Sequence, residues 1–174
     1  MKTSKASWQA LLSQVLEATN KGKTPSSRLA IVGIGNELNG DDAAGVLITR
    51  TLVPALKESP TIKIFEAGQA LENITGALIR FKPDAILFID ALSIGTQPGS
   101  IHMLDWQLSQ GFSASTHSLP LGVVIQYLLH EHTCQIHILG IQASDTATGA
   151  PVSPEVLHSI DSVSNFILSS LSPA

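Results

Sequence analysis

The feature that most constrains the fold is the segment LAIVGIGNELNGDDAAG, residues 29–45. Its first part, Leu29–Ile34, is an apolar run rich in β-branched residues, which is typical of a buried parallel strand. A tight loop of Gly, Asn and Asp follows, and these residue types tolerate unusual backbone angles. Asp41 and Asp42 come next, and an alanine-rich apolar segment then predicts a helix. This layout places carboxylates at the carboxyl end of a strand, where ligands bind in open α/β sheets.

The two adjacent acids have two interpretations. A single Asp near a helix start is usually explained by N-capping and by the helix dipole. Neighbouring residues point in different directions, so one acid can cap while the other faces a cleft. A carboxylate in a cleft is a candidate metal ligand or a candidate general acid or base.

The glycine loop does not match a nucleotide-binding motif. A Walker A loop requires a Lys followed by Ser or Thr after the glycines, and neither is present. In a dinucleotide fingerprint the glycine after Gly33 and Gly35 would stand at Leu38, and the acids of the loop would repel a pyrophosphate. We therefore expect no nucleotide cofactor.

Composition narrows the class of protein. Apolar residues make up 44% of the 174 residues and charged residues 14%, which is typical of a globular chain with a real core. The net charge is −4 without a basic cluster, so we expect no nucleic-acid and no membrane partner. The single cysteine, Cys134, allows no intrachain disulfide, and the sequence shows neither a signal peptide nor a membrane-spanning run. We expect a cytoplasmic monomer.

Apolar residues at helical spacing predict an amphipathic helix over residues 5–19, and a polar linker follows at residues 20–27. We divide the chain into this N-terminal helix and linker, residues 1–28, and a single domain, residues 29–174. Because exposed apolar stripes are uncommon, we expect the helix to pack on the domain; docking to a partner is the alternative.

Strands and helices alternate along the rest of the chain, which predicts an α/β fold with a mostly parallel five-stranded sheet covered on both faces. Residues 66–68 read as a turn. The segment at 100–104 follows a loop too short for a helix, so it should be an antiparallel edge strand, with His102 on the surface. Strands are predicted at 29–34, 61–65, 84–90, 100–104 and 135–142, and helices at 43–56, 70–81, 120–130 and 153–171.

The predicted order of strands and helices brings three polar residues together as a candidate metal site. Asp90 ends the predicted strand at 84–90, and His117 stands just before a predicted helix. Taken alone, Asp90 could cap a loop and His117 could be structural. Together with Asp42 they supply two oxygens and one imidazole nitrogen, a set that suits nickel or zinc better than calcium and leaves coordination positions open.

A second group resembles a soft-metal cluster by composition alone: His130, His132, Cys134 and His137. The segment runs from a helix end into a strand, so we expect these side chains to diverge. We predict no metal site there.

Five motifs resemble the maturation endopeptidases of [NiFe] hydrogenases, and the similarity is closest to the branch that processes the large subunit of the hydrogenase 3, or formate-hydrogenlyase, type. They occur in the family's order and spacing, over roughly residues 29–171. The motifs are GIGNELNGDDAAG (33–45), LFIDAL (87–92), PGSIHMLD (98–105), STHSLPLG (115–122) and ILGIQ (138–142).

The resemblance implies a three-layer α/β/α sandwich around a twisted sheet. It implies a hydrolase, an aspartic-type or nickel-dependent endopeptidase that removes a C-terminal extension from the large-subunit precursor after nickel insertion. Asp42, Asp90 and His117 would be both metal ligands and catalytic residues, and the nickel would be carried by the precursor rather than held by the enzyme. This nickel would signal that metal insertion into the precursor is complete. It would also polarise the scissile carbonyl or activate water. Asp41 would cap the helix or support Asp42.

Two positions depart from the family pattern. Ala43 stands where the family commonly has Gly, and Glu66-Ala67-Gly68 replaces an acid-Gly-Gly turn. The helix before Leu29 lies outside the resemblance. The alternative function is a nickel-dependent checkpoint protein that binds the precursor without cutting it.

Overall fold

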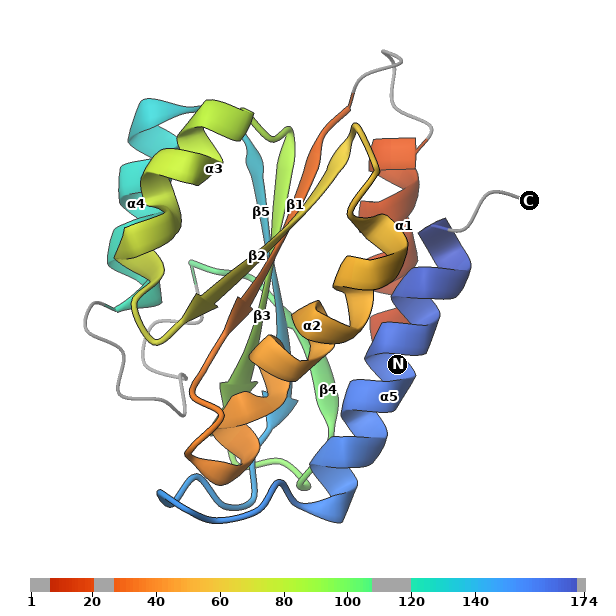
Figure 1. Cartoon of the computed structure of the whole chain (residues 1–174), viewed down its shortest axis with the longest axis vertical. Coiled ribbons are helices and arrows are strands. Elements are labelled where there is room, and N and C mark those ends of the chain that lie inside the picture. The colour runs from red at the N-terminus through yellow and green to blue at the C-terminus, as the bar shows by residue number, and fades with distance from the viewer. Residues whose placement is uncertain (1–6, 21–26, 108–119, 172–174) are drawn as a thin grey trace, which may run out of the picture.

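The structure is a computed structural model that describes residues 7–20, 27–107 and 120–171. A five-stranded sheet of order β2-β1-β3-β5-β4 forms its centre (Figure 1). Four strands run parallel, and β4 is antiparallel to β5 at the edge of the sheet, as predicted. The strands are β1 (Leu29–Ile34), β2 (Ile62–Gly68), β3 (Ala85–Leu92), β4 (Ile101–Leu104) and β5 (Gln135–Gln142).

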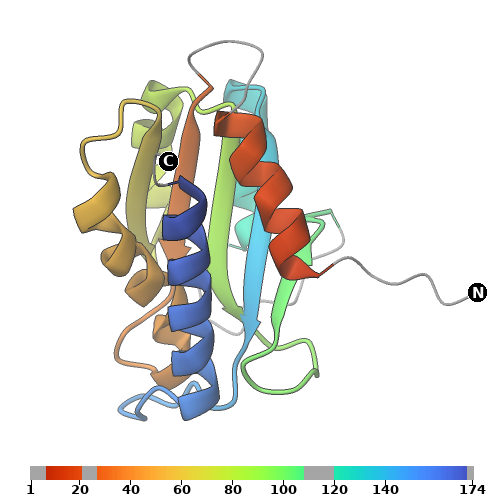
Figure 2. The same cartoon turned by 90° about the vertical axis from the view of Figure 1, so that its right-hand side faces the viewer.

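Helices cover both faces of the sheet, which confirms the three-layer α/β/α architecture (Figures 1 and 2). One face carries α1, α2 and α5, and the other carries α3 and α4. Within the described ranges, no helix has the length and apolar character that a membrane crossing needs. The helices are α1 (Trp8–Asn20), α2 (Ala44–Leu56), α3 (Thr75–Phe81), α4 (Leu121–Glu131) and α5 (Pro154–Leu171), and two short 3₁₀ helices are η1 (Gly40–Ala43) and η2 (Leu71–Ile74).

The alternation of side chains along the strands builds two cores. In β1, Leu29 and Ile31 pack under α1, α2 and α5, whereas Ala30 and Val32 pack under α3 and α4. Every residue of β1 and of β3 is buried. This burial on both faces explains why these strands read as uninterrupted apolar runs.

The N-terminal helix packs on the same core. Leu12 and Leu16 of α1 are buried together with residues of β1, α2 and α5. Trp8 meets Phe166 of α5 edge to face, with ring centroids 5.3 Å apart. Figure 2 shows α1 lying beside α5 over the sheet, as the apolar stripe of the helix predicted.

Three predicted boundaries were wrong. β2 continues to Gly68 through the residues we assigned to a turn, because Gly68 still pairs with Ile34 of β1. β3 continues past Asp90 to Leu92, because β5 extends equally far beside it. The helix predicted from residue 70 begins as the 3₁₀ turn η2.

Candidate active site

The loop between β1 and η1 holds Asp42 in a fixed position. Gly35 adopts φ +131°, and a Cβ atom there would lie 1.8 Å from the carbonyl oxygen of Asp42, so the turn requires glycine. The backbone N–H of Asn36 donates a 2.9 Å hydrogen bond to Oδ2 of Asp42. The Asn36 side chain in turn accepts from the N–H of Leu38, which closes the loop on itself. The carboxylate of Asp42 is buried, with 1% of the residue exposed.

Glycine also brings the start of α2 onto the sheet. A Cβ atom at Gly45 would lie 2.2 Å from the carbonyl oxygen of Ile89 and 2.4 Å from that of Ile34. The first turn of α2 therefore rests directly on the carboxyl ends of β1 and β3. Because η1 immediately precedes this turn and lies against β3, Asp42 is held at the same end of the sheet as Asp90.

Asp90 is fully buried within β3, opposite Gly140 of β5. The alternation of β3 places it on the same face as Ile86 and Phe88, which is the face covered by α3 and α4. The position thus lies inside the strand rather than at its end. Two buried carboxylates at one end of a parallel sheet are an arrangement suited to metal contact or acid–base chemistry.

Asp41 does not cap its helix, so that interpretation was wrong: η1 has no side-chain cap. Its buried carboxylate accepts four hydrogen bonds from the segment after β5. These come from the N–H groups of Ser144 (2.7 Å), Asp145 (3.0 Å) and Ser153 (2.7 Å) and from the hydroxyl of Ser153 (3.0 Å). Asp41 therefore ties that segment to η1, directly beside Asp42 in the chain.

An ion-pair cluster that the sequence did not reveal lies on the outer side of the same loop. Arg50 of α2 binds Glu66 of β2 with two hydrogen bonds, of 2.9 and 2.7 Å, and also pairs with Glu37 of the loop. The hydrogen bond from Arg50 and its positive charge lower the pKa of Glu37. Arg50 thereby connects α2 with the loop that holds Asp42 and with the end of β2.

The predictions for His117 and His102 have different outcomes. His117 lies outside the described residues. Its contribution to a site with Asp42 and Asp90 is therefore untested. Among the described residues there is no group of three or more His, Cys, Asp or Glu that could hold a metal ion. His102, which we placed on the surface, is partly buried, and its Nε2 hydrogen-bonds with the hydroxyls of Ser100 (3.0 Å) and Thr96 (3.2 Å).

His137 is separated from His132 and Cys134. His132 Nε2 lies 2.9 Å from the carbonyl oxygen of Pro83. Cys134 packs with the core under α3 and α4, where burial raises the pKa of its thiol. His137 instead lines a cavity under α1. His132 and Cys134 line one small pocket and His137 lines another, so the predicted divergence is confirmed for His137 and is wrong for His132 and Cys134.

Comparison with known proteins identifies the family. A family model described as hydrogenase maturation protease matches residues 46–170. The chain belongs to the hydrogenase maturation proteases. It is 35% identical over 147 residues to a putative hydrogenase maturation protease of Methanocaldococcus jannaschii, covering 81% of this chain and 86% of that protein. It is 29% identical over 131 residues to the hydrogenase 3 maturation protease of Escherichia coli, covering 75% of this chain and 82% of that protein.

Solved structures of hydrogenase maturation proteases share the fold. The crystal structure of a [NiFe] hydrogenase maturation protease from Thermococcus kodakarensis superposes with a TM-score of 0.77 at 32% identity, covering 90% of this chain and 98% of that one. The solution structure of an endopeptidase from Escherichia coli gives a TM-score of 0.71 at 24% identity, covering 82% of this chain and 90% of that one. Membership of this family assigns the chain a peptidase role in hydrogenase maturation.

Proposed function

We propose that this chain is an endopeptidase that removes a C-terminal extension from the large-subunit precursor of a [NiFe] hydrogenase after nickel has been inserted. The observation that supports this proposal is the burial of Asp42 and Asp90 at one end of the sheet. Carboxylates buried at the carboxyl end of a parallel sheet lie where ligands bind in α/β proteins, so they are candidates for metal contact or acid–base chemistry. The peptidase family to which the chain belongs supplies the reaction class.

Asp42, Asp90 and His117 are proposed to contact the nickel that the precursor carries. α4 supports the inclusion of His117, because α4 leads into β5 and its first residue, Leu121, therefore faces the carboxyl end of the sheet. His117 precedes that residue by only four positions. Carboxylate oxygens with one imidazole nitrogen form a ligand set that suits nickel.

The residues of the chain then have separable roles. Asn36 orients the carboxylate of Asp42 through its backbone N–H. Asp42 and Asp90 bind the incoming precursor through its nickel, and one of them accepts the proton of the attacking water as general base, in the manner of an aspartic-type enzyme. The precursor's nickel polarises the scissile carbonyl. A precursor without nickel lacks this contact, so the enzyme would leave it uncut.

This proposal makes nickel part of the substrate and gives the enzyme no resident metal. The proposed partner is the nickel-loaded precursor. The similarity to the hydrogenase 3 maturation protease of Escherichia coli favours a precursor of the hydrogenase 3 type. Action as a monomer in the cytoplasm remains a prediction from the sequence.

Mass spectrometry of the precursor tests the proposal. Nickel-loaded and nickel-free precursors are incubated with the wild-type protein and with the variants Asp42→Asn, Asp90→Asn and His117→Ala. Asp161→Asn, on the exposed side of α5, is the matched control. We expect a C-terminal peptide to be lost only from nickel-loaded precursor, and only with wild type and the control.

Two other outcomes would overturn parts of the proposal. Stable binding without loss of mass would favour the nickel-dependent checkpoint protein. Cleavage that persists in all three site variants would place the active site elsewhere.

A further inference from the structure

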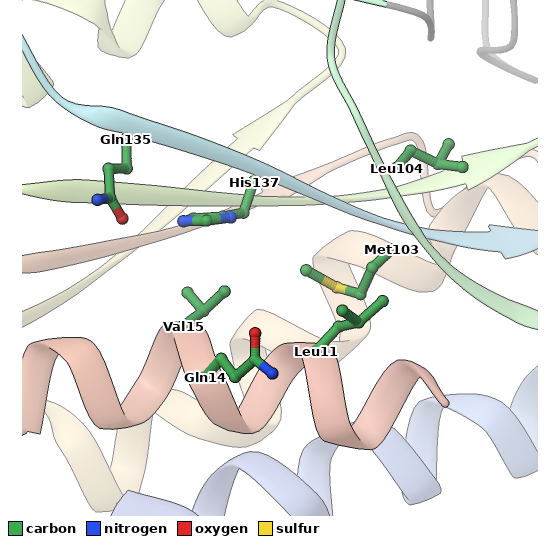
Figure 3. A pocket seen from close by; sticks show the side chains of 7 residues that line it. All are labelled: Leu11, Gln14, Val15, Met103, Leu104, Gln135 and His137. Atoms are coloured by element: carbon green, nitrogen blue, oxygen red, sulfur yellow. The ribbon is translucent and has the colours of Figure 1, made fainter. Parts of the chain in front are cut away.

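A cavity of about 350 Å³ lies between α1 and the outer part of the sheet (Figure 3). Its floor includes His137 of β5, which by strand alternation shares a face with Leu139 and Ile141. Asp90 faces the opposite side of the sheet, so the cavity is separate from the candidate active site. The residues that line it are Leu11, Gln14 and Val15 of α1, Met103 and Leu104 of β4, and Gln135 and His137 of β5.

The packing of α1 and the length of β4 leave this space open. α1 turns Leu12 and Leu16 into the core and rests on α5 through Trp8. β4 pairs with β5 only along residues 138–141, so the beginning of β5 extends beyond it. Among the described residues, the cavity forms where α1 passes over the part of β5 that β4 does not pair with.

His137 gives the cavity a polar group that can bind a ligand. Its Nε2 atom is buried and has no hydrogen-bond partner among the described residues. Burial also lowers the pKa of the imidazole, so the ring is neutral near pH 7. Figure 3 shows the ring and the Gln14 amide directed into the same space between β5 and α1. Buried polar atoms are normally paired, so a partner for Nε2 is expected within the cavity.

We propose that this cavity binds an uncharged aromatic compound that carries a hydrogen-bonding group on its edge. None of the described residues that line it is charged, so a charged ligand would lose its hydration without gaining a counter-charge. Leu11 and Val15 offer apolar contact, and the thioether of Met103 interacts favourably with aromatic rings. Gln14, Gln135 and His137 supply neutral hydrogen-bonding groups. The volume lies in the range of roughly 300–1,000 Å³ that is usual for small-molecule sites.

The proposal does not depend on the peptidase reaction, and NMR titration of the full chain tests it without a precursor. The probe is indole, which has two fused rings and one N–H group. Indane has a similar shape without that group, and indole-3-carboxylate adds a charge. We expect saturable shifts for indole at the amides of α1, β4 and β5. Indane should bind about tenfold more weakly, as expected for the loss of one hydrogen bond, and the carboxylate should not bind.

Three variants locate the binding. His137→Phe keeps an aromatic ring but removes the nitrogen, and Gln14→Trp fills the mouth from an exposed position of α1. His137→Phe should abolish the preference for indole over indane, and Gln14→Trp should weaken the binding of both compounds. His130→Phe, on the exposed surface of α4, is the control and should bind as wild type does.

The amide spectrum of each variant shows whether it is folded. If His137→Phe does not fold, Gln14→Trp decides the question, because it leaves the core intact. Shifts that fail to saturate, or saturable binding that neither variant weakens, would overturn the proposal.

Discussion

Among single residues, Asp41 makes one of the densest sets of contacts near the candidate site. Its carboxylate accepts four hydrogen bonds from the segment after β5. Asp41→Asn replaces one carboxylate oxygen by an NH₂ group. That group faces the N–H donors of the segment after β5, which then lose their acceptor. We expect the free energy of unfolding to fall by about 2–4 kcal/mol, measured by urea denaturation. Asp161→Asn, at an exposed position of α5, is the control. An equal loss in both variants would contradict the role assigned to Asp41.

Gly45 sets how closely α2 approaches the sheet. The Cβ atom introduced by Gly45→Ala would collide with the backbone of β1 and β3, and backbone cannot give way as a flexible side chain can. We expect a loss of about 1–3 kcal/mol in unfolding free energy, together with slower precursor cleavage because η1 shifts with α2. Gly76→Ala is the matched control, since its Cβ would lie 3.4 Å from only the tip of Arg80. A stable, fully active Gly45→Ala protein would show that this close approach does not position Asp42.

Among the elements, Arg50 links α2, the loop after β1 and the end of β2. Both pairs are exposed, so each contributes little by itself and is screened by salt. The pKa of Glu37 is lowered from its ordinary value of 4.5 in the folded chain. Its contribution to stability is therefore present above the unfolded pKa and is lost as the pH falls through the folded pKa.

The expected result is that Arg50→Met lowers the urea midpoint at pH 7 and that the difference from wild type shrinks below about pH 4. Lys57→Met, for which the described structure shows no ion pair, is the control. A difference that does not change with pH would mean that Arg50 acts through packing of its aliphatic stem.

The sequence predicted the strands and helices better than it predicted the side-chain contacts between them. β1 and β5 matched their predicted bounds because apolar runs bounded by turn residues mark buried strands. The predicted end of β3 was two residues too early because Asp90 is polar. Only the pairing with β5 shows that the strand continues to Leu92. Asp42 and Asp90 were predicted to lie at one edge of the sheet because both follow parallel strands, and the structure places them at that end. Their role as site residues stays a prediction. The role of Asp41 could not be found, because its partners lie 103–112 positions away in the chain.

For the whole molecule, the central question is whether α1 unfolds with the rest. Leu12 and Leu16 are buried in the same core as β1, and Trp8 packs on α5. A helix that shares the core should unfold in the same cooperative transition. The two tryptophans allow a direct test. In a Trp106→Phe background, Trp8 is the only tryptophan, so tryptophan fluorescence reports the environment of α1.

We expect the urea transition of Trp8 fluorescence to coincide with the far-UV circular dichroism transition of the whole chain. Leu12→Ala should move both transitions together and lower the unfolding free energy by about 2–5 kcal/mol. Leu157→Ala, at an exposed apolar position of α5, is the control and should change it by less than about 0.5 kcal/mol. A fluorescence transition at lower urea than the dichroism transition would show that α1 detaches first. In that case α1 would be a separable cover over the cavity rather than part of the cooperative core.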